Sequence, residues 1–341
     1  MKENDMSIQE GVEEIKVSVK KAVNTITSAE TNNGISLTVQ DENTGTYTTQ
    51  IRTEKIVSDY YFYNQLSENG KIIYNTIEGN LDNMKSGLYT IDFGTKFNET
   101  LQTEKGKQEL KVDFQAAWDA LSLDNPKVFF IDVTKLYLTI ESSTLGSTTT
   151  CTTYIGPEEN KSYLIEGIKQ EEINEFEQQL ESIKNNVVAN VSGSDYDKVK
   201  QIHDVLVDEL EYDQTLSRTD THNIYGALME KSVVCEGYAK AFKYLLDGIG
   251  IPCVLVSGKG TNSKGETEEH IWNYVYLDDR WYAVDVTWDD PIVTGGTLTN
   301  KMKNKYFLKG ALEFNTNHVA NNYLSNNSFR FEYPKLSNQD Y

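Results

Sequence analysis

The sequence predicts an α+β fold, with helices and antiparallel strands in separate stretches of the chain. Apolar side chains recur every three or four positions in several stretches, which is typical of amphipathic helices. Residues 270–277 and 280–288 instead have the pattern of strands, with Leu277-Asp278-Asp279-Arg280 as a turn between them. We therefore expect a helix packed on an antiparallel sheet, preceded by an N-terminal α+β extension.

The elements of the extension follow from the same periodicities. Apolar residues between Val12 and Ile26 predict an amphipathic helix, and the polar stretch from Ser28 to Gly45 predicts a linker. Strand-like segments then reach about residue 56. The later elements are expected in this order: a helix at 59–77 that Gly70 could break, a helix at 112–121, a turn at 124–126, a buried strand at 128–133, a Thr-rich hairpin at 136–140 and 148–155, and helices at 173–187 and 196–210.

The run Ser192-Gly193-Ser194 separates the last two of these helices, so we place a domain boundary there. The chain then divides into a helix and polar linker at 1–50, an upstream α+β region at 51–192, and a core at 193–341. A second division stays open, because the helix before Ser192 could pack into the core and form one continuous α+β unit.

The composition excludes several classes of protein. The chain has 341 residues, enough for two domains or one large one, and its net charge is −20 with no basic patch. We therefore expect neither a nucleic-acid partner nor an anionic membrane surface as partner. No apolar run approaches membrane-spanning length, and the first residues do not resemble a signal peptide. Three widely spaced cysteines do not predict a disulfide framework.

Cys235 stands at the start of the most apolar helical stretch. Across residues 235–247 the apolar positions are spaced by four, three and four, as on the packed face of a helix. Gly250 and Pro252 then supply the usual stop signals. Cys235 is therefore expected at or near a helix N-terminus, where free backbone N–H groups and the helix dipole favour a thiolate and can bind a developing oxyanion.

The strand pair that follows predicts a shared position for His270 and Asp285. If Asp278 and Asp279 form a two-residue hairpin loop, Trp272 lies opposite Asp285. Because side chains alternate faces, His270 and Asp285 then share one face as diagonal neighbours, roughly 7–8 Å apart at the backbone. That separation suits a hydrogen bond between the imidazole and the carboxylate. A slip of one residue would place Asp285 on the opposite face.

These three contexts carry a family resemblance. Val-Cys-Glu-Gly-Tyr-Ala, His-Ile-Trp-Asn and Trp-Tyr-Ala-Val-Asp-Val-Thr-Trp-Asp-Asp-Pro occur in this order between Asp197 and Pro291. The stretch resembles the transglutaminase-like superfamily, a cysteine-nucleophile group with a papain-like core, and fits its bacterial members best. The resemblance implies that Cys235 is the nucleophile, His270 the base and Asp285 the carboxylate that orients it. Members are often exported or displayed at the cell surface, so it also implies a secreted or surface location.

Other residues near these motifs have simpler explanations. Trp272 is expected to pack in the hairpin and could also wall a substrate pocket, and Tyr225 is a candidate side chain for the oxyanion hole. His318 is expected to pack or to form hydrogen bonds. Cys151 and Cys253 fit half-buried or core positions. Asp289 and Asp290 fit turn and capping bonds better than a calcium loop, so we expect no metal and no cofactor.

The predicted chemistry is acyl transfer through a thioester. We expect a protein or peptide substrate, with the thiolate attacking a carboxamide such as a glutamine side chain. An amine acceptor would give a cross-link and water would give deamidation, while attack on a backbone amide would make the same site a protease. Glutamates around the two motifs favour a lysine acceptor slightly. A scaffold that keeps the fold without turnover is the hypothesis from a different class.

Overall fold

The computed structural model describes residues 9–10, 26–31, 34–40, 47–51, 60–159, 161–216, 218–291, 299–321, 324–325 and 329–341. The chain forms two compact units. Unit 1 contains residues 1–57, 66–118 and 132–164, and unit 2 contains residues 58–65, 119–131 and 165–341. Within the described residues, no helix is both long enough and apolar enough to cross a bilayer.

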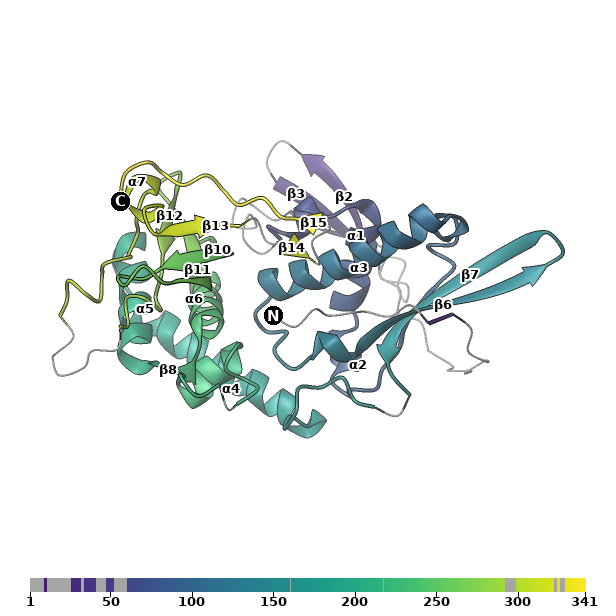
Figure 1. Cartoon of the computed structure of the whole chain (residues 1–341), viewed down its shortest axis with the longest axis horizontal. Coiled ribbons are helices and arrows are strands. Elements are labelled where there is room, and N and C mark those ends of the chain that lie inside the picture. Colours follow the sequence, from purple (N-terminus) through teal and green to yellow (C-terminus); the bar gives the residue numbers. More distant parts are fainter. Residues whose placement is uncertain are drawn as a thin grey trace. The chain divides into compact units, whose positions relative to one another are not determined.

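Unit 1 contains two sheets and several helices (Figure 1). Its four-stranded sheet has the order β1-β6-β7-β5, and its three-stranded sheet has the order β2-β3-β4. The strands are β1 (Gln9–Glu10), β2 (Ile26–Thr31), β3 (Gly34–Gln40), β4 (Tyr47–Ile51), β5 (Ile91–Gly94), β6 (Leu136–Leu145) and β7 (Thr148–Pro157). The helices are α1 (Glu68–Glu78), α2 (Leu81–Met84) and α3 (Glu104–Asp124), of which α3 ends in unit 2.

The N-terminal sheet corrects one prediction. We expected a polar linker at Ser28–Gly45, but β2 and β3 pair antiparallel there, with Ile26 opposite Val39 and Thr31 opposite Gly34. Ser and Thr made the stretch look like a linker, yet threonine is also a good strand former, and Ile35, Leu37 and Val39 alternate as a strand requires. Most of the helix expected between Val12 and Ile26 lies outside the described residues.

The rest of unit 1 follows the prediction with shifted boundaries. The Thr-rich hairpin is confirmed as β6 and β7, which pair from Leu136–Pro157 to Leu145–Thr148 around a turn at Gly146 with φ +65°. The helix expected at 59–77 begins only at Glu68, because the Ser67 side chain accepts a hydrogen bond from the Gly70 amide and caps it. Gly70 therefore lies inside α1 and causes no break.

The segment at 128–133 is not the strand that we predicted. Phe129, Phe130 and Ile131 are buried as expected, at 2%, 1% and 7% exposure. They are not part of a strand, since Ile131 forms only a single β-bridge, and Val133–Lys135 is a turn of 3-10 helix. The Phe130 carbonyl accepts a hydrogen bond from the Ile165 amide instead. An apolar run gives burial but does not identify a strand partner.

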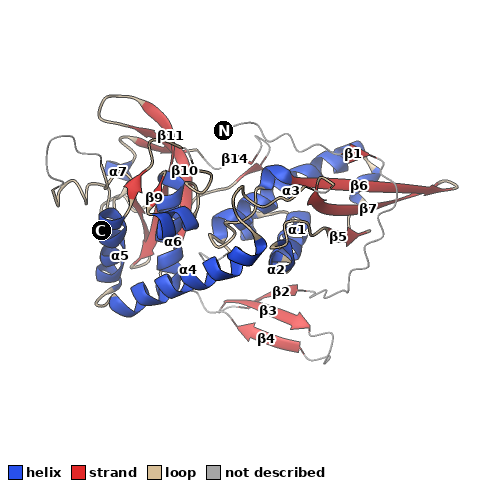
Figure 2. Cartoon of the chain, turned by 90° about the horizontal axis from the view of Figure 1, so that it is seen from below, coloured by secondary structure: helices blue, strands red, loops and turns tan. Residues whose placement is uncertain are grey.

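Unit 2 is an α+β core in which helices pack on a four-stranded antiparallel sheet. The sheet order is β12-β11-β10-β13, built from β10 (Cys253–Thr261), β11 (Thr267–Leu277), β12 (Arg280–Val284) and β13 (His318–Ala320). Helix α6 (Cys235–Ile249) contacts both β10 and β11, and it also contacts α4 (Gln170–Asn190) and α5 (Asp195–Glu209). Figure 2 shows these three helices beside the sheet. The shorter elements are β8 (Glu211–Tyr212), η5 (Gly226–Glu230), β9 (Ser232–Val233), α7 (Ala311–Phe314), β14 (Leu324–Ser325) and β15 (Phe329–Arg330).

Local sequence signals define the ends of the helices in unit 2. Ser194 and Asp197 form reciprocal bonds at the start of α5, as a capping box does. Helix α6 ends at Gly250, which has φ +71°, a left-handed conformation that favours glycine. The division at Ser192 does not match the compact units, because α4 packs against α6 and belongs to unit 2.

Candidate active site

Cys235 is the first residue of α6. Strand β9 leads into it, and the extended Val234, with φ −94° and ψ −178°, turns the chain into the helix. The amides of Gly237 and Tyr238 donate back to the Val234 carbonyl at 2.9 and 3.3 Å. The Cys235 amide precedes these bonds, at the position where a helix has no internal partner for an N–H group. Cys235 itself is a partly exposed free thiol, whereas Cys151 and Cys253 are buried.

The hairpin that carries the other two residues has the predicted register. Asp278 and Asp279 form its two-residue loop with φ of +46° and +61°, and Leu277 pairs with Arg280. Pairing continues to Asn273 and Val284, after which β12 ends and Asp285 follows directly. Since no slip occurs, His270 and Asp285 lie on the same face.

His270 and Asp285 form a buried pair. The His270 Nε2 atom lies 2.7 Å from the Asp285 Oδ2 atom, and their side chains are 3% and 0% exposed. Burial lowers the pKa of His270, but the charge and hydrogen bond of Asp285 and a hydrogen bond from Cys235 raise it from 6.5 to about 10. Burial raises the pKa of Asp285, but His270 and His318 hold it well below its usual range. The pair therefore favours an imidazolium beside a carboxylate.

Cys235 completes the arrangement. The Cys235 thiol is one of the groups that raise the pKa of His270, so its side chain lies beside the imidazole. Because Nε2 of the imidazole is occupied by Asp285, the Nδ1 atom is the one left for the sulfur. The structure thus brings together the three residues that the sequence selected, in the order thiol, imidazole, carboxylate.

Asp285 has two further hydrogen bonds that the sequence did not predict. The His318 Nε2 atom lies 3.0 Å from the same Oδ2 atom, and the Trp288 amide donates to Oδ1 at 3.1 Å. One ligand-type atom each from His270, Asp285 and His318 lies within 4.8 Å of the others. This set could hold a metal ion in principle. All three side chains are buried and both histidines are hydrogen-bonded to Asp285, so the geometry suits a hydrogen-bond cluster better.

Aromatic rings enclose His270. The Trp288 ring stacks on the imidazole at 4.9 Å between centroids, with an angle of 22° between the planes. Trp272, which we predicted to wall a pocket, is only 1% exposed and packs on Phe314 and His318. The face of β11 that carries it is therefore covered. Trp288 lies where we had placed Trp272, in contact with the imidazole and partly exposed.

Tyr225 lies apart from this cluster. Its hydroxyl donates to Glu230 at 3.4 Å, and its ring contacts Phe129 and Phe176. A different tyrosine is near the thiol. Burial, followed by the charges of Cys235 and Glu268, raises the pKa of Tyr212 to about 12. Tyr212 pairs with Val233 in a short parallel ladder, two residues before Cys235. A ladder of two residues leaves no periodicity in the sequence, so no signal pointed to Tyr212.

A second buried pair supports the loop after β12. The His203 Nε2 atom lies 3.1 Å from the Asp289 Oδ2 atom, both side chains being 0% exposed. Asp289 Oδ1 accepts the Tyr306 amide at 2.8 Å, and the Asp289 amide donates to the Asp285 carbonyl. Burial raises the pKa of Asp289 to about 6, against the lowering effect of His203. These bonds agree with the predicted turn and capping role.

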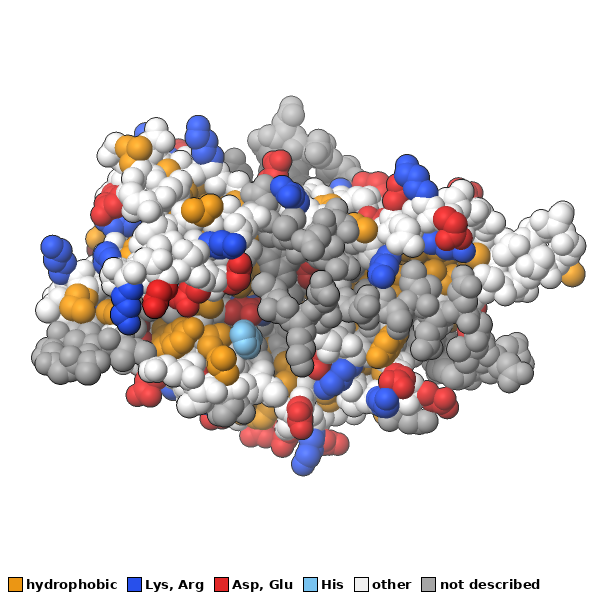
Figure 3. Space-filling model, viewed as in Figure 1, with side chains coloured by type: hydrophobic (Ala, Val, Ile, Leu, Met, Phe, Trp, Pro, Cys, Tyr) orange, Lys and Arg blue, Asp and Glu red, His pale blue; other side chains and the backbone are white. Residues whose placement is uncertain are grey.

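Some of the glutamates near the site form ion pairs and others are exposed to solvent. Glu236 pairs with Lys240 at 2.7 Å and with His222 at 3.1 Å. Burial raises its pKa, but Lys240 and His222 lower it to about 2. Glu266, Glu268 and Glu269 are exposed. Figure 3 shows acidic side chains gathered beside hydrophobic ones on the surface over α6, β8 and β11.

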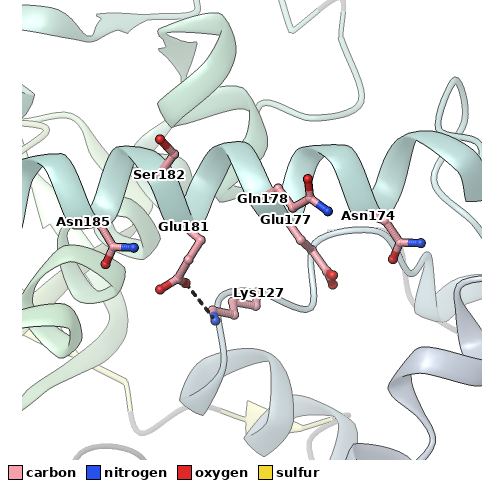
Figure 4. Close-up of a pocket in the computed structure, with 7 residues that line it drawn as sticks. All are labelled: Lys127, Asn174, Glu177, Gln178, Glu181, Ser182 and Asn185. Carbon is pink, nitrogen blue, oxygen red and sulfur yellow. Dashed lines mark hydrogen bonds and ion pairs between the residues drawn. The ribbon is translucent and has the colours of Figure 1, made fainter.

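A polar groove of about 730 Å³ lies elsewhere in unit 2. One side of α4, from Asn174 to Asn185, lines it together with Lys127 (Figure 4). Lys127 and Glu181 approach to 3.4 Å across it, and both are about half exposed. None of the residues around Cys235 lines this groove, so it is not part of the candidate active site.

A known family matches the part of the chain that carries these three residues. Residues 181–286 match the model of the Transglutaminase-like superfamily, so the chain contains a transglutaminase-like domain in an α+β protein. The match includes Cys235, His270 and Asp285.

Two named proteins are similar to this chain in sequence. The chain is 30% identical over 142 residues to the protein named Kyphoscoliosis peptidase of Mus musculus, and 28% identical over 144 residues to that of Homo sapiens. Each match covers 38% of this chain and 21% of the relative, so the chain spans about a fifth of the length of these proteins. Among solved structures, one described as a TGase is 16% identical, with a TM-score of 0.31, over 51% of this chain and 50% of that one.

Proposed function

We propose that this chain is an enzyme that uses Cys235 to transfer acyl groups from protein carboxamides through a thioester. The observation that carries the proposal is the series in which the Cys235 thiol acts on His270 and His270 is hydrogen-bonded to the fully buried Asp285. A structural cysteine needs no imidazole, and an isolated buried imidazole–carboxylate pair needs no thiol. The three together are what a thiol nucleophile requires.

In the proposed starting state His270 already carries the proton on Nδ1, so Cys235 is a thiolate beside an imidazolium. The sulfur attacks the carbon of a glutamine carboxamide, and the oxygen becomes an oxyanion beside the Cys235 amide at the start of α6. The C–N bond then breaks as His270 returns its proton to the nitrogen. Ammonia leaves and a thioester remains on Cys235.

The second half-reaction frees the enzyme. A lysine amine, or a water molecule, attacks the thioester carbon while His270 accepts its proton. The carbon–sulfur bond breaks, which restores the thiolate beside the imidazolium. With an amine, the product is an isopeptide cross-link. With water, the product is glutamate. The exposed Glu266 and Glu268 favour a cationic acceptor at the entrance, whereas Glu269 pairs with Lys259, and Glu236 pairs with Lys240 and His222.

Peptide hydrolysis is the second candidate function. The observation that favours it is the match to relatives named as peptidases. The same three residues would attack a backbone amide, and His270 would protonate the departing amine. The two functions share every step except the identity of the bond that breaks and of the acceptor.

One experiment separates these outcomes. The protein is incubated with a glutamine-containing protein and a labelled primary amine, and the products are analysed by mass spectrometry beside a Cys235→Ala control. Incorporation of the amine supports a transglutaminase, and a gain of about one mass unit at glutamine supports a deamidase. Cleavage of the backbone would support the peptidase. Turnover that survives Cys235→Ala would contradict the proposal as a whole.

A further inference from the structure

A second imidazole shares the carboxylate of the candidate triad. The Nε2 atoms of His270 and His318 lie 2.7 and 3.0 Å from one oxygen of Asp285, Oδ2. The other oxygen accepts the Trp288 amide at 3.1 Å. The side chains of Asp285 and His318 are both 0% exposed. Water therefore does not compete for these bonds, and the carboxylate depends on protein donors alone.

The orientation of His318 is fixed from three directions. Its backbone lies in β13, where it pairs with Gly260 of β10. Its ring stacks on Phe314 at 4.0 Å with an angle of 16° between the planes. Its Nδ1 atom lies 2.9 Å from Asn317 Oδ1. The side-chain Nδ2 of Asn317 in turn donates to the Tyr306 hydroxyl at 2.8 Å. Since an ionised carboxylate can only accept, the Nε2 atom of His318 must carry a hydrogen and donate it.

In this arrangement His318 affects the Asp285 carboxylate and does more than fill space. A buried carboxylate held by one histidine can rotate about its own side chain or take the proton of that histidine. A second donor on the same oxygen opposes both changes, because it fixes the rotation and makes the oxygen less basic. The result is an Asp285 that stays ionised and stays directed at His270.

We infer that His318 is a positioning residue for the catalytic imidazole, acting through Asp285. The inference rests on the proposed function of Cys235, His270 and Asp285, which it extends to a four-residue series. His318 touches no reacting atom in this scheme. His318 orients the Asp285 carboxylate by a hydrogen bond. Asp285 in turn orients the His270 imidazolium, which stabilises the thiolate.

Two substitutions separate positioning from packing. His318→Phe keeps a ring that can stack on Phe314 but removes both nitrogen atoms. His318→Gln loses the ring but can return one N–H donor to Asp285. The measurement is the rate at which iodoacetamide alkylates Cys235 in the full chain as pH is varied, followed by peptide mass spectrometry. Cys253, which is buried, is the internal control thiol, and circular dichroism monitors the fold.

We expect His318→Phe to lower the alkylation rate of Cys235 near pH 6 by about tenfold to a hundredfold, the equivalent of one hydrogen bond to a charged group. The variant and the native protein should converge above about pH 9, where an ordinary thiol ionises without an imidazolium. His318→Gln should recover most of the rate near pH 6. This recovery is what a packing role would not give.

Three results would overturn the inference. The rates of His318→Phe and the native protein could coincide near pH 6, His318→Gln could fail as completely as His318→Phe, or the loss could be the same at every pH. A fourth result concerns the proposed function instead. If Cys235 of the native protein is as unreactive as Cys253, the nucleophile assignment fails, and the inference about His318 falls with it.

Discussion

Replacing Asp285 by asparagine tests how strongly the carboxylate supports the imidazolium. The change keeps the size of the side chain but removes the charge that lies 2.7 Å from His270. In the native protein the pKa of His270 is raised from 6.5 to about 10. At about 1.36 kcal/mol for each pH unit, that difference corresponds to as much as about 5 kcal/mol of stabilisation.

The sign of the pH dependence follows from the raised pKa. The folded protein binds the proton on His270 more tightly than the unfolded chain does, so the stabilisation is complete below about pH 6.5. It is lost as the pH rises through about 10. We therefore expect the free energy of unfolding of the native protein to fall by about 2–5 kcal/mol across this window. Without the charge of Asp285, burial dominates and the fall should be largely absent.

The assay is urea unfolding followed by tryptophan fluorescence at about pH 6.5, 8 and 10. A His270→Gln variant is the matched control, because it retains every other group that titrates in this range. The difference between the native protein and this control isolates the contribution of His270. If Asp285→Asn loses stability with pH as steeply as the native protein does, the reasoning about the buried pair is refuted.

Five further substitutions test the catalytic residues, the buried pair of His203 and Asp289, and the space beside Trp288. Cys235→Ala should abolish turnover and leave the unfolding transition in place. His270→Ala should reduce turnover about as much and Asp285→Ala somewhat less, since these groups act as a unit. An active Cys235→Ala variant would contradict this. His203→Ala leaves Asp289 buried without its partner and should destabilise the protein by about 3–5 kcal/mol in urea unfolding, whereas an unchanged midpoint would show that the pair is not needed. Gly260→Ala would place a methyl group 2.7 Å from the Trp288 ring and 3.3 Å from His270. The resulting small misplacement of these side chains should lower turnover by about tenfold. Native activity would mean that Trp288 moves aside without effect.

The central part of the site could be predicted because it depends on local rules. Alternation along two strands joined by a two-residue loop determines which side chains share a face, and this parity placed His270 beside Asp285. Helix periodicity placed Cys235 at the start of α6. Both rules act over fewer than about 20 residues, the range over which periodicity is informative.

The parts that could not be predicted depend on contacts between distant segments. His318 reaches Asp285 because β13 joins the sheet beside β10, a pairing that three residues of sequence cannot specify. Tyr212 approaches Cys235 through the two-residue ladder of β8 and β9. Similarly, the burial of Trp272 results from Phe314 and His318 covering its face, and periodicity within β11 carries no information about that cover.

The reactivity of Cys235 is the most direct measure of the central claim, because it needs no knowledge of the substrate. The native protein is treated with iodoacetamide at about pH 6–7, where an ordinary thiol is mostly un-ionised, and alkylation of each cysteine is followed by mass spectrometry. We expect rapid labelling of Cys235 and almost no labelling of Cys151 and Cys253. His270→Gln should strongly slow the labelling of Cys235. Labelling of Cys235 that is as slow as that of Cys253, or that is unaffected by His270→Gln, would contradict the central claim.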